Sequence, residues 1–224
     1  MKKGRISNNV IRRLPKYLRK LDELAEKGVD RISSGELGMQ MGLTASQIRQ
    51  DFSCFGEFGQ QGYGYPVKSL RQEVASILGM NRGYATILVG VGNLGRALAE
   101  NFDFRSNGFT LLAAFDINPS LIGKRVAGIP VYSMSDLKDF IKLCKVDIAV
   151  IAVSKDAARH VAAQLSDCGI RAICNFTNTD LGLRDSGVLV EDVHFSDSFH
   201  ALSYYLTERL KREELEPAPS SLEK

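Results

Sequence analysis

A glycine-rich stretch near the middle of the chain constrains the fold more than any other feature. The apolar residues 85–89 lead directly into Gly90-Val91-Gly92-Asn93-Leu94-Gly95, and a helical pattern follows from Arg96. A GxGxxG pattern between a strand and a helix is typical of dinucleotide-binding α/β domains. We expect Gly90 to make a tight turn, Gly92 to let a pyrophosphate approach the backbone, and Gly95 to let the helix pack closely on the strand.

An acidic residue follows the next expected strand. Asp116 stands at the end of residues 109–115, 21 positions after Gly95. An acid at this point binds the ribose hydroxyls of the adenosine and repels a 2′-phosphate. The helix that begins in the glycine stretch supplies free amides for the phosphates. The sequence therefore predicts a site for NAD(H) rather than NADP(H).

The second half of the chain alternates strands with helices, as a doubly wound α/β parallel sheet requires. Residues 146–153 form a nearly unbroken apolar run, which suits a strand covered on both faces. We expect this Rossmann domain to span 84–196. The predicted strands are 85–89, 109–115, 129–131, 146–153, 170–175 and 188–190, and the predicted helices are 94–102, 135–143 and 156–168.

Two capping boxes mark a helix-turn-helix in the first part of the chain. They are Ser33 with Glu36 and Thr44 with Gln47, and each predicts the start of a short helix. The two helices, over 34–41 and 45–54, are separated by Gly42-Leu43. The second helix is expected to face DNA bases with Ser46, Gln47, Arg49 and Gln50.

The flanking segments complete a winged-helix domain over 1–79. A helix is predicted over 8–27, with Pro15 either in its first turn or kinking it. The glycine- and aromatic-rich residues 55–65 suit a tight β-hairpin, the wing, and a helix over 68–78 closes the module. Residues 79–83 form the expected linker.

Charge separates the two parts of the chain. Residues 1–83 hold 14 Lys and Arg against 8 Asp and Glu, a net +6, whereas residues 84–224 carry −3, which returns the overall +3. A basic module beside a mildly acidic one predicts that the first meets a polyanion. Without an apolar run of transmembrane or signal-peptide length, the expected location is the cytoplasm, where four cysteines without a CxxC pair are expected to be free and mostly buried.

The histidines do not suggest catalysis. A dehydrogenase needs a proton donor or acceptor beside the nicotinamide. His160, His194 and His200 have no recognisable partner set, and neither Tyr204 nor Tyr205 has a lysine four residues on. We therefore expect no enzyme and no metal site, and an NAD-dependent oxidoreductase stays the alternative.

The last predicted helix, 197–214, has Asp197 as its expected N-cap and an apolar face. That face is formed by Phe199, Leu202, Tyr205, Leu206 and Leu210. A terminal amphipathic helix must bury its face, either on its own domain or on a second subunit. Residues 215–224 are expected to be a flexible tail.

Several motifs together resemble the Rex family of bacterial redox-sensing repressors. The resemblance covers residues 8–212 and is carried by six stretches, with Asn175-Phe176 matching the start of a further motif. The stretches are Arg13 to Arg19, Arg31 to Ser34, Gln47 to Asp51, Phe55 to Gly59, Gly62 to Tyr65, and Gly90 to Gly95.

The resemblance implies a homodimer that binds a palindromic operator when NAD+ predominates and is released by NADH. It also implies that the last helix inserts between the two domains of the partner subunit. Arg49 and its helix, which Thr44 starts, would read bases, and Lys16 would hold phosphates together with Gln61 and Tyr63 of the wing. Asn175 and Phe176 would join the residues from Gly90 to Gly95 and Asp116 at the cofactor, and Arg19 would take part in an interdomain switch.

This sequence departs from the family pattern at several of these positions. Family members usually have a basic residue at Gln50 and a basic pair at Gln60-Gln61, and each lost phosphate contact removes ~0.9 from the log–log salt slope. The switch tyrosine falls near Asn101 or Phe102, and the switch aspartate at His194. Cys54 replaces a tyrosine, and Thr177-Asn178 replaces Ala-Pro. These departures keep open a second alternative, a nucleotide-binding regulator that has lost DNA binding.

Overall fold

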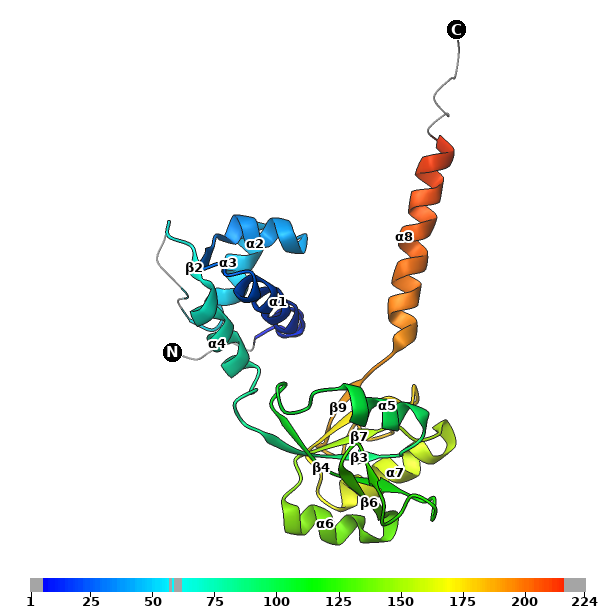
Figure 1. Ribbon diagram of the computed structural model, residues 1–224. Coiled ribbons are helices and arrows are strands. Elements are labelled where there is room, and N and C mark those ends of the chain that lie inside the picture. The colour runs from blue at the N-terminus through cyan, green and yellow to red at the C-terminus, as the bar shows by residue number, and fades with distance from the viewer. Residues whose placement is uncertain (1–5, 57, 59–61, 216–224) are drawn as a thin grey trace. The chain divides into compact units, whose positions relative to one another are not determined.

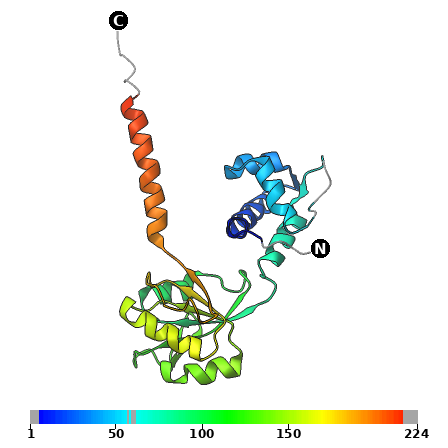
Figure 2. The same ribbon diagram turned by 180° about the vertical axis from the view of Figure 1, so that it is seen from behind.

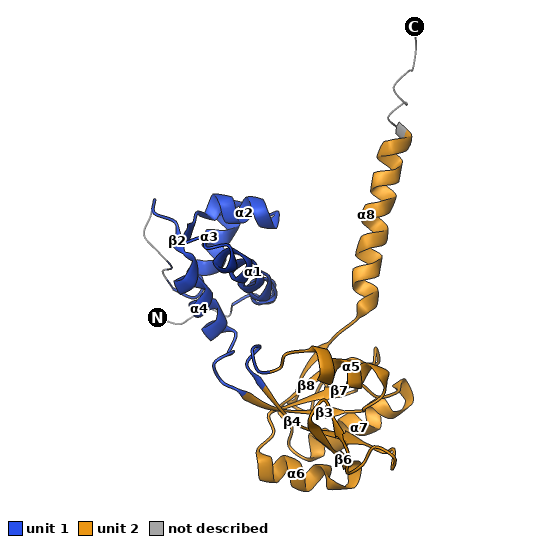
Figure 3. Ribbon diagram, viewed as in Figure 1, with its two compact units in different colours: residues 1–83, 105–109 blue, residues 84–104, 110–224 orange. Residues whose placement is uncertain are grey.

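A computed structural model describes residues 6–56, 58 and 62–215, with the side chain of Leu215 excepted. The chain divides into two compact units, residues 1–83 with 105–109, and residues 84–104 with 110–224 (Figure 3). The first unit ends at Gly83 and includes residues 79–83, for which a linker was predicted. The short segment 105–109, predicted to belong wholly to the second domain, groups with the first unit. Gly108 explains this grouping, because a Cβ on it would lie 2.4 Å from the Cα of Met80.

The first unit consists of four helices and a two-stranded antiparallel ribbon within the described residues (Figure 1). Its core joins all four helices through Leu14, Leu37, Ile48 and Leu70, with Tyr17 and Phe52 in tilted ring contact. Pro15 lies inside α1, beyond its first turn. The elements are α1 (Asn8–Glu26), β1 (Arg31–Ile32), α2 (Ser34–Met41), α3 (Ala45–Ser53), β2 (Tyr65–Pro66) and α4 (Val67–Ile77).

The expected wing lies partly outside the described residues, which omit 57 and 59–61. The strand described at its end, β2, pairs with β1 through Ile32 and Tyr65 rather than within 55–65. Gly64, at φ +69°, permits this pairing, because a Cβ on it would lie 2.8 Å from the carbonyl oxygen of Ile32. The hairpin over 55–65 therefore stays a prediction.

The second unit is a Rossmann sheet with helices on both faces. Its strand order is β5-β6-β4-β3-β7-β8-β9. Apart from the short antiparallel edge strand β5, the strands numbered along the chain read 3-2-1-4-5-6, the doubly wound order. The strands are β3 (Tyr84–Val89), β4 (Phe109–Asp116), β5 (Arg125–Val126), β6 (Ile129–Ser133), β7 (Ile148–Ile151), β8 (Ala172–Asn175) and β9 (Leu189–Asp192).

Helices cover both faces of the sheet (Figures 1 and 2), and alternating residues of the central strand β3 pack in the clusters of opposite faces. Ile87 and Val89 pack with α6 (Leu137–Cys144) and α7 (Lys155–Asp167), whereas Leu88 packs on the side of α5 (Asn93–Asn101). A 3-10 turn, Met134–Asp136, precedes α6. On the α5 side the sheet is less covered beyond β7, because the described residues between β8 and β9 include no helix. Leu189 is accordingly 74% exposed.

The C-terminal helix α8 (Phe195–Leu215) begins two residues earlier than predicted. Asp197 therefore lies in its first turn and is not its N-cap, although an acid there still favours the positive end of the helix dipole. Its large apolar side chains are exposed, between 48% for Leu210 and 69% for Phe199. Among the described residues, no helix combines the length and the apolar character needed to cross a membrane.

Candidate nucleotide and nucleic-acid sites

Gly90 and Gly95 have the packing roles predicted for them. Gly90 has φ +94°, its amide donates to the Phe115 carbonyl at 2.8 Å, and a Cβ on it would lie 2.6 Å from the Ala152 carbonyl oxygen. A Cβ on Gly95 would lie 1.9 Å from the carbonyl oxygen of Gly90. The two glycines therefore allow β3, α5 and the end of β7 to approach one another closely.

Gly92 differs from its two neighbours because nothing fills the space beside it. It is the N-cap residue of α5, in an extended conformation, and a Cβ on it would meet no atom within 4 Å. The next residues, Asn93 and Leu94, are exposed. A helix N-terminus carries free amides and a partial positive charge. This open end can accept a phosphate without displacing protein atoms.

Asp116 closes one side of this loop. Its carboxylate accepts hydrogen bonds from the Val91 amide at 2.7 Å and from the Asn118 amide at 2.8 Å. Neither contact was predicted. A carboxylate has about four acceptor positions, so two amides leave capacity for a diol. The side chain thus holds the glycine loop and stays able to receive ribose hydroxyls.

Asn175, expected at the cofactor by resemblance, is completely buried, and both atoms of its side-chain amide make hydrogen bonds within the protein. Its Nδ2 donates to the Thr179 carbonyl at 2.9 Å and to Asp192 at 2.7 Å, and its Oδ1 accepts from the Thr177 amide and hydroxyl. Asn175 therefore shapes the loop after β8. Phe176 is half-buried and packs in the same cluster as Val91.

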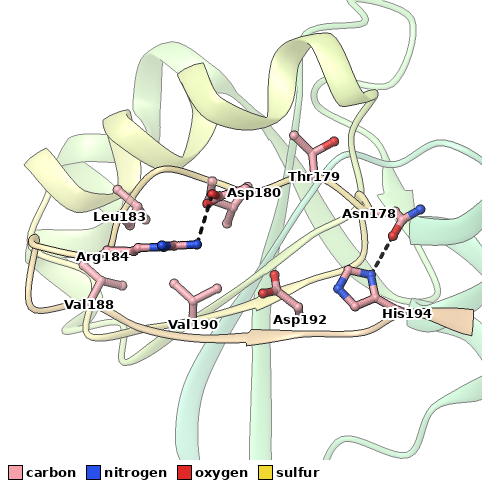
Figure 4. Close-up of a pocket in the computed structure, with 10 residues that line it drawn as sticks. Asn178, Thr179, Asp180, Leu183, Arg184, Val188, Val190, Asp192 and His194 are labelled. Atoms are coloured by element: carbon pink, nitrogen blue, oxygen red, sulfur yellow. Dashed lines mark hydrogen bonds and ion pairs between the residues drawn. The ribbon is translucent and has the colours of Figure 1, made fainter. Parts of the chain in front are cut away.

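A cavity of about 420 Å³ is lined by this loop and by residues of β9 (Figure 4). At one end Asn178, with φ +55°, contacts His194, with 2.6 Å between Oδ1 and Nδ1. Arg184 and Asp180, four positions apart in the loop that lines the cavity, form an exposed ion pair at 3.7 Å. The contact of His194 was not predicted, and it ties the segment that precedes α8 to the loop after β8.

The helix-turn-helix forms at the predicted positions. Ser33 and Glu36 make a complete capping box, whereas at Thr44 only the first half forms, with the Gln47 amide donating to the hydroxyl at 3.1 Å. Gly38 allows the turn to close, because a Cβ on it would lie 2.5 Å from the Leu43 carbonyl oxygen. This packing brings the start of α3 against α2.

Most of the predicted DNA-facing side chains are on the surface. Ser46, Arg49 and Gln50 are exposed and Gln47 is half-buried. The Arg49 guanidinium donates to the Ser34 hydroxyl at 3.0 Å, which ties it to the start of α2. Lys16 and Arg19 on α1 are exposed, as is Tyr63, and Gln60 and Gln61 lie outside the described residues.

A buried carboxylate on α3 was missed by sequence reasoning. Asp51 is 1% exposed and accepts from Arg13 Nε at 2.6 Å, Arg13 Nη2 at 2.8 Å and the Tyr17 hydroxyl at 2.7 Å. Burial alone would raise the pKa of Asp51, but hydrogen bonds from Arg13 and Tyr17 outweigh it and hold that pKa below its ordinary value. Burial, with the bond to Asp51, raises the pKa of Tyr17. A usable signal existed: Asp51 is three residues from Ile48 and next to Phe52, on the apolar side of α3.

The remaining candidate groups do not assemble into a further centre. His160 and His200 are exposed on α7 and α8. The four cysteines are free, as predicted, but half-buried rather than mostly buried, because Cys54 and Cys168 end helices and Cys174 faces the less covered side of the sheet. Over the residues that the structure describes, no three His, Cys, Asp or Glu side chains could hold a metal ion together.

Comparison with known proteins matches both units. A family model described as "CoA binding domain" matches residues 81–179, and one described as "Putative DNA-binding protein N-terminus" matches residues 5–53. A protein named redox-sensing transcriptional repressor Rex from Thermoanaerobacter pseudethanolicus is 48% identical over 207 residues, 92% of each chain. Its namesake from Caldicellulosiruptor bescii is 48% identical over 213 residues, 95% of this chain and 98% of that one.

Solved structures of a Rex-family repressor, RSP, are also similar. The crystal structure of RSP with β-NAD+ and operator DNA has a TM-score of 0.85 and 46% identity, and covers 95% of this chain and 97% of that chain. The structure of RSP with β-NADH has a TM-score of 0.87 and 43% identity, and covers 95% of this chain and 100% of that chain.

Proposed function

This chain belongs to the Rex family of redox-sensing transcriptional repressors, and we propose that it binds palindromic operator DNA and is released from it by NADH. The observation that carries the proposal is the open space beside Gly92, which Asp116 bounds, in a chain whose first unit contains a helix-turn-helix. A nucleotide site and a DNA-reading module in one polypeptide are the parts that a ligand-responsive repressor needs.

The residues of the Rossmann unit fit NAD(H). Gly92, with the amides of Asn93 and Leu94, would receive the pyrophosphate, and Asp116 would receive the ribose hydroxyls. The Asp116 carboxylate would repel the extra phosphate of NADP(H). NAD+ carries a cationic nicotinamide and NADH a neutral one, so an apolar pocket favours the reduced form through desolvation. Asn175 would hold the loop there, and Phe176 would supply part of its apolar wall.

In the first unit α3 would lie in the major groove. Arg49, assisted by Ser46, Gln47 and Gln50, would read base edges near the helix start that Thr44 caps. Lys16, Tyr63 and Gln61 would contact the sugar-phosphate backbone. Glutamine at 50 and 61 carries no charge, so we expect a shallower salt dependence than lysine or arginine there would give.

A homodimer through α8 is the proposed assembly. The exposed apolar face of α8 needs a cover, and the less covered side of β8 and β9 offers apolar surface at Leu189. Insertion of α8 into a second copy would satisfy both surfaces, and the two-fold symmetry would match a palindrome. A two-state dimer could then convert a preference for NADH into a change of DNA affinity.

The interdomain switch is proposed to differ from the family pattern. Arg19 is available on the surface of α1, whereas His194 takes the position of the usual aspartate and contacts Asn178. An Arg19–aspartate ion pair therefore cannot form at that position. We also propose that the chain acts in the cytoplasm and catalyses no hydride transfer, in keeping with relatives that are named as repressors.

Selection of DNA from a random pool, with NAD+ and again with NADH, tests this function directly. We expect NAD+ to yield a palindrome and NADH to abolish its enrichment, with anisotropy titrations giving the affinity under each condition. Equal DNA affinity with either nucleotide would refute the NADH response. Nucleotide binding with no enriched sequence would favour the regulator that has lost DNA binding, and steady oxidation of NADH with a small substrate would favour the oxidoreductase.

A further inference from the structure

The Asp51 carboxylate accepts three directional hydrogen bonds that hold α3 in the first unit. Apolar contacts of Ile48 and Phe52 press α3 against the core, but apolar attraction is not directional. The guanidinium of Arg13 binds Asp51 through two of its nitrogens, and a bidentate pair of this kind adds geometric specificity to its energy. The Tyr17 hydroxyl adds a third bond to the same carboxylate.

All three bonds come from α1, so they fix α3 relative to one neighbouring helix. On a helix of 3.6 residues per turn, Asp51 lies about 160° around the axis from Arg49, on nearly the opposite side. Any rotation of α3 that would turn Arg49 toward a different base edge must also move Asp51 away from the guanidinium. The buried side of the helix thus determines the orientation of its exposed side.

We infer that Arg13 and Tyr17 are positioning residues for sequence recognition, which through Asp51 fix the rotation of α3 and hence the base edges that Arg49 and its neighbours reach. This role rests on the proposed function, and it assigns neither residue a contact with DNA. The side chain of Arg13 is 22% exposed, and its bonds to Asp51 direct two of its nitrogens inward. Sequence discrimination would depend on Arg13 and Tyr17, whereas attraction to phosphates would not.

The test separates those two quantities in the full-length chain. Affinity is measured by anisotropy for the selected palindrome and for a random-sequence duplex over a range of salt concentrations. For Asp51→Asn we expect palindrome affinity to fall by about tenfold or more, comparable to one lost base contact. Its affinity for the random duplex should stay within about twofold and its salt slope unchanged, because no phosphate contact is lost.

Lys16→Gln is the matched control on the same helix. As a proposed phosphate contact, it should weaken binding to both duplexes and lower the salt slope by ~0.9. Arg13→Lys keeps the charge but not the bidentate geometry, so it should lose discrimination as Asp51→Asn does. In the Asp51→Asn background, Arg13→Gln should cause no further loss of discrimination between the two duplexes, because Arg13 acts through Asp51. If Asp51→Asn does not fold, Tyr17→Phe and Arg13→Lys carry the same test, with the helical circular-dichroism signal and its thermal unfolding as the check that the first unit is folded.

Two results would overturn the positioning role alone: full discrimination in the Asp51, Arg13 and Tyr17 variants, or an Arg13→Gln variant that weakens both duplexes equally with a lower salt slope. The second result would make Arg13 a direct phosphate contact. A wild-type chain that binds both duplexes alike would instead overturn the proposed function and this role with it.

Discussion

Alanine at Gly92 should weaken nucleotide binding without loss of stability, whereas alanine at Gly95 should destabilise the fold, although only two residues separate these positions. At Gly95 the new Cβ would lie 1.9 Å from the Gly90 carbonyl oxygen, so the backbone must move by about 1 Å or more to reach an ordinary contact. Overpacking of this kind costs about 1–3 kcal/mol, against a gain of about 1 kcal/mol from the better helix propensity of alanine.

At Gly92 the same methyl group enters open space, and φ −71° with ψ −168° is extended backbone that alanine adopts without strain. Such a substitution stabilises a folded protein by about 0.4–1 kcal/mol, because alanine lowers the conformational entropy of the unfolded chain. The methyl group would, however, fill the proposed seat of the pyrophosphate. We expect NADH binding to weaken at least about tenfold, or 1.4 kcal/mol, while stability is kept or improved.

Thermal unfolding and calorimetric titration with NADH measure the two effects on the same samples. Gly95→Ala should lower the Tm of the Rossmann unit by roughly 2–8 °C, and Gly92→Ala should leave it unchanged or raise it slightly. Wild-type NADH affinity in Gly92→Ala would refute the assignment of that space to a phosphate. A wild-type Tm in Gly95→Ala would show that the loop adapts to a side chain and that our packing argument is wrong.

Acid should destabilise the N-terminal unit through Asp51, whose pKa in the folded chain lies below its ordinary value of 3.8. The unfolded chain then binds more protons than the folded chain, so the contribution of the Asp51 carboxylate to the free energy of unfolding is complete above about pH 4. It is lost as pH falls through the folded pKa. Urea unfolding should detect this pH dependence in the wild type, and Asp51→Asn should lack it. Burial, with smaller effects of Glu191 and Asp192, raises the pKa of the Cys174 thiol to about 11. Iodoacetamide should therefore modify it slowly at pH 8, where roughly 0.1% is thiolate, and rapid labelling of Cys174 by mass spectrometry would contradict this. Leu206→Glu should turn the dimer into a monomer in sedimentation experiments, because a charge on the apolar face of α8 would be buried without a partner, whereas Lys211→Glu on the opposite face should not.

Local patterns were enough to predict much of the fold. The capping residues Ser33 and Thr44 placed the starts of α2 and α3 correctly, because a cap bonds to amides only two or three residues away. The glycine stretch likewise placed the turn between β3 and α5. Both signals depend on neighbours in sequence, which a single chain displays in full.

Burial patterns proved less exact about boundaries. The apolar run 146–153 predicted a strand of that length, but β7 covers only Ile148–Ile151. Val146 is buried just after α6, and Ala152 and Val153 turn beside Gly90. An apolar run thus records which residues are covered, while hydrogen bonds to neighbouring strands decide where a strand ends.

Contacts between distant residues were beyond sequence reasoning. Asp51 meets Arg13 from 38 positions away, and Asn175 meets Asp192 from 17 positions away. The motif around Asn175 was assigned to the cofactor by resemblance, yet no local pattern indicated that the side-chain amide of Asn175 would form hydrogen bonds inside the protein. Such pairings depend on the packing of whole elements, which no spacing rule encodes.

The position of α8 after all strands of the Rossmann sheet has a genetic consequence. The first unit and all strands of the Rossmann sheet precede Phe195, so a premature stop codon just before this helix would leave their sequences whole. The product would still fold its helix-turn-helix unit and its glycine loop, but it would lack α8, the segment proposed to join two copies. A nonsense mutation just before Phe195 should therefore abolish operator occupancy as completely as an early one, while leaving a protein that still binds the coenzyme.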